Sequence, residues 1–133
     1  MNQEQVLEFA TKYGYKPNGA KKAFNDIHTI LFEDESLKAI LEGLLDKISG
    51  RRISGTGIVI LSNKRIIFYR KSFIGTITRE EIPIGKITSI SMRKGFLSAP
   101  KMCIKSANDE SIVMVSDHNL LNKFINDVQN LIN

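Results

Sequence analysis

The side chains with the most reactive chemistry are few and lie far apart in the sequence. They are two histidines, His28 and His118, and one cysteine, Cys103. A nucleophilic cysteine needs an exposed position and an activating cation. Cys103 instead lies between Met102 and Ile104 in a predicted strand, a setting typical of an inert core residue. A structural zinc site needs clustered nitrogen and sulfur ligands, which these positions do not supply. The sequence therefore predicts no catalytic residue and no metal site.

The carboxylates do not indicate catalysis either. Glu80 and Glu81 are adjacent, so in a strand they face opposite ways and cannot act as a paired acid and base. The run Glu33-Asp34-Glu35 lacks the alternating ligands and the glycine of a calcium loop, and we interpret it as a helix-to-strand connection. Glycine-rich nucleotide loops and the His-Glu-x-x-His motif are also missing from the sequence. We expect a protein that is not an enzyme and has no cofactor.

The basic residues are the stronger chemical signal, because they are concentrated. The chain has a net charge of +5, and residues 51–116 hold 12 Lys and Arg against 4 Asp and Glu. Such a field favours anionic partners, namely nucleic acid or an acidic membrane surface. The alternative is a set of solvated strand faces whose cations keep sheet edges from pairing. The candidate anion-binding residues are Arg51, Arg52, Lys64, Arg65, Arg70, Lys71, Arg93 and Lys94.

Residues 1–32 show the apolar spacing of two short helices. The first stripe, at i, i+3, i+4 and i+7, consists of Val6, Phe9, Ala10 and Tyr13. Gly14 is a stop signal, and a second stripe of the same period occupies residues 20–31 after a break at 17–19. We expect a helical hairpin that packs on the core or binds a partner. A DNA-binding helix-turn-helix is the alternative, although this segment is net acidic and a recognition helix should be basic or amide-rich.

The middle of the chain has the pattern of short strands. Runs rich in β-branched and aromatic residues, or alternating in polarity, occupy residues 58–61, 66–69, 76–84, 87–92, 101–106 and 111–116. Residues 37–45 fit a helix or a strand by period alone. Between the first two runs, Asn63 is expected to adopt the positive φ of a tight hairpin turn. Turn signals every ~8–12 residues predict an antiparallel sandwich or barrel.

The chain closes with an amphipathic helix that Ser116 or Asp117 can cap. Its broad apolar stripe consists of Leu120, Leu121, Phe124, Ile125, Val128, Leu131 and Ile132. The other face carries mostly amides rather than the cations of a membrane-surface helix, so we expect this helix to face a core. No apolar run approaches the ~20 residues that cross a bilayer, and the N-terminus lacks the features of a secretory signal. A single cysteine excludes an internal disulfide, and we expect a cytoplasmic protein.

This order of elements resembles a pleckstrin-homology (PH) domain, most closely the bacterial PH-like domains of the YokE-like type. The resemblance rests on residues 34–35, on residues 57–68 (GIVILSNKRIIF), on residues 81–90 (EIPIGKITSI) and on the closing helix. Ser62 stands where the family usually has threonine, and Ile84 where it usually has an aromatic residue. The resemblance implies an α+β, mainly β, fold. It consists of an antiparallel, partly open barrel of about seven strands capped by a C-terminal helix over residues 33–133, preceded by the helical hairpin of residues 1–32.

The resemblance implies a non-enzymatic module that binds other proteins. Some relatives of this type self-associate. Eukaryotic PH domains that hold phosphoinositides use spaced basic residues in the first hairpin loop, which would lie here within residues 47–55. Arg51 and Arg52 are adjacent, so on a strand they point to opposite faces unless Gly50 and Gly55 permit a bend.

The pair Lys64-Arg65 allows two interpretations. Placed at a hairpin tip, the two cations either mark the end of the turn and shield a strand edge or supply part of an anion site.

Protein–protein interaction is the first functional hypothesis. Binding of nucleic acid or acidic membrane through the basic segment is the alternative, and no small-molecule substrate is indicated.

Overall fold

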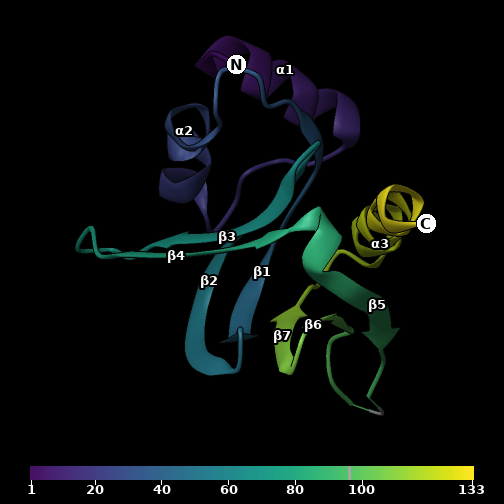
Figure 1. The fold of residues 1–133 in the computed structure, drawn as a ribbon. Coiled ribbons are helices and arrows are strands. Elements are labelled where there is room, and N and C mark those ends of the chain that lie inside the picture. Colours follow the sequence, from purple (N-terminus) through teal and green to yellow (C-terminus); the bar gives the residue numbers. More distant parts are fainter. Residues whose placement is uncertain (96) are drawn as a thin grey trace.

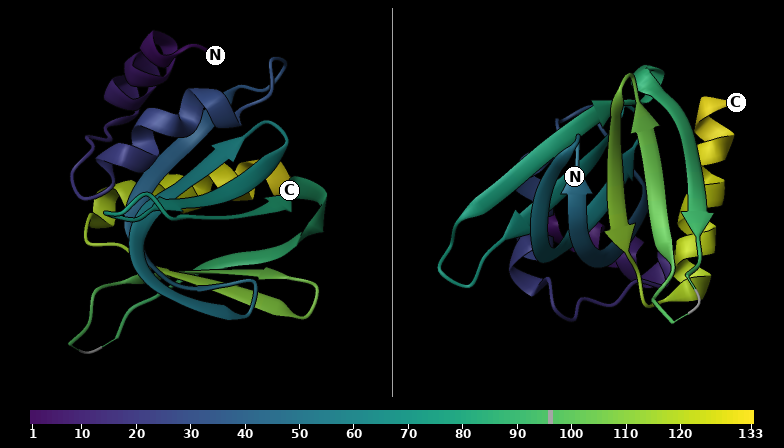
Figure 2. Two further views of the ribbon diagram at one scale, coloured as in Figure 1. Left: turned by 90° about the vertical axis from the view of Figure 1, so that its left-hand side faces the viewer. Right: turned by 90° about the horizontal axis from the view of Figure 1, so that it is seen from below.

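The computed structural model describes residues 1–95 and 97–133 (Figure 1). In order, the elements are α1 (Gln3–Tyr13), α2 (Lys21–Ile30), β1 (Leu37–Ile48), β2 (Arg51–Ser62), β3 (Arg65–Lys71), β4 (Ile77–Pro83), the 3-10 turn η1 (Ile84–Lys86), β5 (Ile87–Arg93), β6 (Lys101–Ser106), β7 (Asp109–Met114) and α3 (His118–Ile132). Over the described residues the strands form one antiparallel seven-stranded sheet in the order β4-β3-β2-β1-β7-β6-β5. The sheet curls into a partly open barrel (Figure 2), which confirms the predicted fold class.

The first hairpin is tighter than the sequence suggested. Residues 37–45, whose pattern fitted a helix or a strand, belong to β1, and β2 begins at Arg51. The connection is the two-residue turn Ser49-Gly50, with φ of 48° and 81°. Positive φ at both central residues gives a turn whose twist matches the flanking strands. The prediction of a loop over residues 47–55 is therefore wrong.

Asn63 does not adopt the predicted positive φ. Its side-chain oxygen accepts a hydrogen bond from the Ser36 amide at 2.9 Å, and its own amide donates to the Ser36 carbonyl at 3.2 Å. This reciprocal pair fastens the β2–β3 turn to the segment that leads into β1. A long-range partner, rather than local turn chemistry, explains the asparagine here.

Strands β2 and β3 are buried on both faces. Every residue from Gly57 to Ser62 and from Arg65 to Tyr69 is buried. Val59 pairs with Phe68, and Ile58 pairs with Tyr69. Because paired residues share a face and neighbours alternate, these two pairs point to opposite sides of the sheet. Continuous apolar strands of this kind need cover on both sides.

Helices from both ends of the chain cover parts of the sheet. Helices α1 and α2 pack against β1, β2 and β3, whereas α3 packs against β1, β5 and η1 (Figures 1 and 2). The Tyr69 hydroxyl donates to Asp26 of α2 at 2.7 Å, which identifies the Tyr69 face as the one under α2. Asp117 caps α3 by accepting a hydrogen bond from the Leu120 amide at 3.0 Å, as predicted.

Glu42 of β1 holds the N-terminus of α2 against the sheet. Helix α2 has no side-chain cap of its own, since its N-cap residue is Ala20. The Glu42 carboxylate instead accepts the amides of Asn18, Gly19 and Ala20 at 3.1, 2.8 and 3.2 Å and the Tyr15 hydroxyl at 2.8 Å. A carboxylate at this position satisfies free amides and complements the positive end of the helix dipole.

Arg65 lies at the centre of a buried ion cluster below the β2–β3 turn. Its guanidinium donates two hydrogen bonds to Glu35, both at 2.8 Å, one to Glu81 at 2.7 Å and one to the Ile30 carbonyl at 3.2 Å. The Glu35 side chain is fully buried and also accepts the Ser62 hydroxyl. Burial raises the pKa of Glu35, but the bonds from Arg65 and Ser62 outweigh it and lower that pKa to about 2. The cluster joins the end of α2, the β2–β3 turn and β4.

Replacing Glu42 should detach α2 from the sheet. We expect Glu42→Ala to lower the free energy of unfolding by about 2 kcal/mol, because three amides and a hydroxyl lose their acceptor. Glu8→Ala is the matched control, since Glu8 is exposed and, among the residues that the structure describes, pairs only with Lys12 at i+4. It should change the free energy by less than about 0.5 kcal/mol. Urea denaturation of both variants measures this, and equal losses would contradict the role given to Glu42.

The Glu35 carboxylate should make folding sensitive to acid. Folding lowers the pKa of Glu35 from 4.5 to about 2. The contribution of this carboxylate to the free energy of unfolding is therefore complete above pH 4.5 and is lost as the pH falls toward 2. We expect the wild type to lose roughly 3 kcal/mol of unfolding free energy to this group across that window. Glu35→Gln should remove that part of the pH dependence, whereas Asp34→Asn, at the exposed neighbour, should keep most of it. An unchanged acid slope in Glu35→Gln, measured by denaturant unfolding at each pH, would refute this assignment.

Candidate functional site

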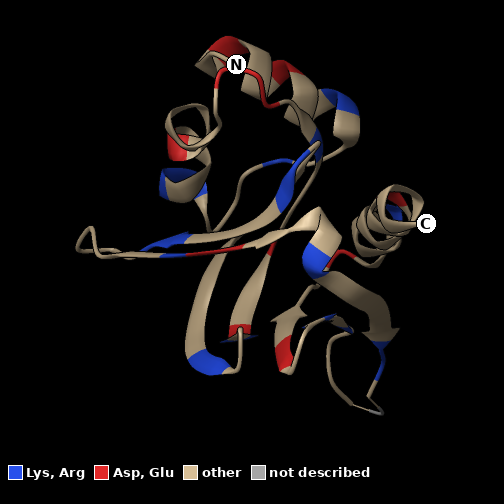
Figure 3. Ribbon diagram, in the orientation of Figure 1, with Lys and Arg blue, Asp and Glu red and all other residues tan. Residues whose placement is uncertain are grey.

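Most of the eight cations proposed as anion ligands already face carboxylates. Arg51 pairs with Glu80, Arg52 with Asp46, Lys64 with Asp34, Arg65 with Glu35 and Glu81, Lys71 with Asp26, and Arg93 with Glu110. Within residues 1–95 and 97–133, Arg70 and Lys94 form no ion pair. Figure 3 shows the basic segments spread over several hairpins and helices, some of them beside acidic ones. An anion at most of these positions would have to displace a carboxylate.

Arg51 and Arg52 are exposed at the start of β2 but point to different partners. Arg51 bonds to Glu80 of β4 at 3.0 Å, and Arg52 contacts Asp46 of β1 at 3.5 Å. The two strands lie on opposite sides of β2 in the sheet order. The adjacent arginines are thus directed to separate carboxylates rather than to one shared position.

Arg70 lies across β2 instead of pointing into solvent. A Cβ atom at Gly55 would come within 1.8 Å of the Arg70 Nε, so the glycine makes room for the arginine. That Nε is buried and has no hydrogen-bond partner among the described residues. Gly55 therefore permits close packing of a side chain, whereas the sequence suggested that it permits a bend in a loop.

The sequence did not identify the tip of the β3–β4 hairpin as a functional feature. Phe73 and Ile74 are 90% and 84% exposed, at the end of a hairpin that projects from the body of the molecule (Figures 1 and 2). Residues 73–75 lie between the predicted strand runs 66–69 and 76–84, so the sequence pattern indicates only a turn region here. Two large apolar residues directly before a glycine were the signal, because turn positions usually carry small or polar residues.

Lys22 and Lys71 lie close behind this tip. The Lys22 ammonium donates to the Phe73 carbonyl at 2.9 Å and lies 5.4 Å from the centre of the Phe73 ring. Lys71 contacts Asp26 at 3.2 Å. Burial raises the pKa of Asp26, but hydrogen bonds from Tyr69 and Lys71 outweigh it and lower that pKa. The pKa of Tyr69 rises to about 12 through burial and its bond to Asp26. The base of the hairpin is thus fastened to α2.

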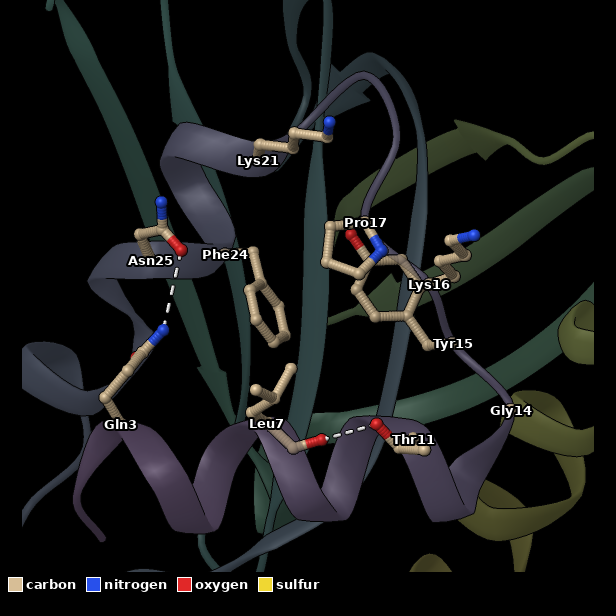
Figure 4. Close-up of a pocket in the computed structure, with 10 residues that line it drawn as sticks. All are labelled: Gln3, Leu7, Thr11, Gly14, Tyr15, Lys16, Pro17, Lys21, Phe24 and Asn25. Carbon is tan, nitrogen blue, oxygen red and sulfur yellow. Dashed lines mark hydrogen bonds between the residues drawn. The ribbon is translucent and has the colours of Figure 1, made fainter.

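A second feature is an open hollow between α1, α2 and the segment that joins them (Figure 4). Its volume is about 680 Å³. The apolar part of its lining comes from Leu7, Tyr15, Pro17 and Phe24, and Lys16 and Lys21 lie at its rim. Leu7 is 51% exposed although it is apolar. This hollow lies in the part of the chain that the sequence assigned to a packing or partner-binding role.

The reactive side chains occupy separate places. Cys103 is buried in β6, and burial raises the pKa of its thiol. His28 lies on α2, and its Nδ1 is buried without a hydrogen-bond partner in the described part of the chain. Among residues 1–95 and 97–133, no group of three or more His, Cys, Asp or Glu is placed to hold a metal ion. None of the helices described is long and apolar enough to cross a membrane.

The fold is shared with solved structures of low sequence identity. The N-terminal PH domain of Vps36 superimposes with a TM-score of 0.60 at 16% identity, over 76% of this chain and 84% of that one. A DUF1696 family protein with a pleckstrin-homology domain from Shewanella loihica gives 0.59 at 15% identity, over 96% and 93% of the two chains. The hSac2 domain of the human phosphoinositide phosphatase Sac2 gives 0.61 at 10% identity, over 98% and 83%. At these identities the likeness shows the fold alone.

The sequence itself matches a family model. No curated protein matches it, but the model described as bacterial PH domain matches residues 31–130. The match begins at the end of α2 and includes every strand of the sheet and most of α3. PH domains are generally binding modules without catalytic activity, and no enzyme family is indicated. The fold and the extent of the match agree, and the chain belongs to the bacterial PH domain family.

Proposed function

We propose that this protein is a non-catalytic module of the YokE-like type that binds another protein in the cytoplasm. The observation that carries the proposal is the hollow between α1 and α2, in which Leu7 is exposed and the buried Phe24 also contributes to the lining. Exposed apolar surface in a concave site is typical of a place where a partner buries its own apolar side chains. The absence of nucleotide, dinucleotide and metalloprotease motifs from the sequence supports binding rather than catalysis.

The charges at the rim indicate what kind of segment fits. Lys16 and Lys21 are exposed, and neither forms an ion pair within the described residues. A complementary partner would place apolar side chains against the exposed Leu7 and carboxylates near the two lysines. The proposed ligand is therefore a protein segment with apolar residues flanked by acidic ones.

Anion binding through the eight predicted cations has less support. Six of them are paired with carboxylates, and Arg65 is buried within its cluster. Binding of nucleic acid by such residues should weaken steeply with salt. A salt titration of any complex therefore separates this alternative from apolar docking.

Leu7 should be needed for partner capture. We expect a protein that the full chain retains from an extract of the native host to be retained about tenfold less by Leu7→Lys, because the charge would enter an apolar contact. Leu131→Lys is the matched control, since Leu131 is a helical leucine that is 41% exposed and lies on α3. Quantitative mass spectrometry compares the three baits. Equal retention by Leu7→Lys and wild type, or retention that disappears at moderate salt in all three, would count against the hollow.

Self-association is the second candidate, favoured by the edges of the sheet. Strands β4 and β5 are the two end strands, and β5 exposes the uncharged residues Thr88, Ser89 and Ser91. The uncharged part of this edge can pair with a second copy, whereas a charge such as that of Arg93 at its end resists pairing. Light scattering after size exclusion should then give a mass above the 15.0 kDa of the chain, increasing with concentration. A constant mass of one chain at high concentration would remove this candidate.

A further inference from the structure

We propose that Asn18 is a site of spontaneous covalent modification, in which its side chain loses ammonia to the backbone of Gly19, and that the Glu42 carboxylate slows this reaction. Asn18 is the only asparagine in the sequence that a glycine follows, and it is exposed on the segment that leads into α2. It does not line the hollow of the proposed function, so the two proposals stand independently.

The reaction needs only water besides the two residues. The Gly19 nitrogen attacks Cγ of Asn18, so that a new N–Cγ bond closes a five-membered succinimide ring. The Cγ–Nδ2 bond breaks, and ammonia leaves with the proton of the Gly19 amide. Water then opens the ring at either carbonyl carbon, which gives aspartate or isoaspartate. A glycine after the asparagine favours ring closure, because no side chain hinders the nitrogen and the backbone rotates freely.

The packing of this segment on the sheet favours a glycine at the same position. A Cβ atom on Gly19 would come within 3.3 Å of Cγ2 of Thr56 in β2 and within 3.5 Å of Oε2 of Glu42 in β1. The close approach lets the amides of Asn18, Gly19 and Ala20 reach the Glu42 carboxylate. The residue that helps to fasten α2 to the sheet therefore also makes Asn18 reactive.

Glu42 opposes ring closure in two ways. The Gly19 amide donates to Oε2 at 2.8 Å, the shortest of the three amide bonds to this carboxylate. Ring closure removes the proton of that amide, and a negative charge beside it disfavours the loss. The bonds from Asn18 and Ala20 also fix the backbone on either side, so the nitrogen can turn toward Cγ only after the segment opens. The rate should therefore follow the local opening equilibrium.

The product weakens the contact that delays its formation. The backbone amide of Asn18 lies 3.1 Å from Oε1 of Glu42, so a carboxylate on residue 18 brings a second negative charge close to Glu42. Isoaspartate also adds a carbon to the backbone between residues 18 and 19, which separates amides that now share one acceptor. Both products loosen the N-terminus of α2, and the change is not reversed by refolding.

Peptide mapping by mass spectrometry of the full chain, incubated at mildly alkaline pH, measures the rate. The same chain unfolded in urea is the reference. We expect Asn18 in the folded wild type to convert at least about tenfold more slowly than in urea, because the segment must first open. Glu42→Ala should convert at least about fivefold faster than the folded wild type, since the Gly19 amide loses its acceptor. Glu42→Gln keeps an acceptor oxygen without the charge, and its rate should lie between these two.

Glu35→Gln is the matched control, since it makes the same substitution in the buried cluster at the other end of α2. It should keep the wild-type rate, and an increase equal to that of Glu42→Gln would show that the reaction follows global unfolding. That result would overturn the inference. So would a wild-type rate in both Glu42 variants, or an unfolded chain in which other asparagines convert before Asn18.

The effect of the product is measured separately. Asn18→Asp should lower the urea midpoint of unfolding, because it places the carboxylate of the product beside Glu42, whereas the neutral Asn18→Gln should not. Equal midpoints in the two variants would overturn the claim that modification loosens α2.

Discussion

The requirement that β2 and β3 be covered on both faces determines most of this structure. A strand whose neighbouring side chains are all large and apolar cannot leave either face in water. In this chain, α1 and α2 cover the face that carries Tyr69 and Ile58, and the opposite face lines the barrel. The helices at the N-terminus therefore share the hydrophobic core with the sheet, although the bacterial PH domain model matches only residues 31–130.

The packing of α2 on the sheet also explains where many of the charged side chains lie. Helices that lie on a sheet must be oriented as well as buried, and the polar contacts around α2 do this. Glu42 binds its N-terminus, Asp26 bonds to β3 from its middle, and Arg65 reaches the carbonyl of Ile30 at its end. Many of the cations in the basic segment thus neutralise carboxylates within the fold. Exposed apolar residues instead lie at the hollow and at the hairpin tip.

Local patterns predicted the elements, but they could not predict the long-range partners. The helical stripes, the Asp117 cap and the strand runs depend on neighbours in sequence, so these elements followed from the patterns, and the PH-like fold class followed from the resemblance. Asn63, Gly55 and Arg65 take their roles from residues that are distant in the sequence, namely Ser36, Arg70 and Glu35. The exposure of Phe73 and Ile74 depends on how far the hairpin extends beyond α2, which the sequence pattern does not contain. The uninterrupted apolar runs of β2 and β3 do indicate that both faces of these strands are buried, since such strands require cover on both faces.

Native-state hydrogen exchange tests the central claim that α2 and the barrel form one cooperative unit. If they do, the most protected amides of α2, such as that of Ile27, should exchange with the same free energy and the same denaturant dependence as that of Ile60 in β2. A separate, smaller opening of residues 1–32 with β2 still protected would contradict the account and make those residues an independent domain.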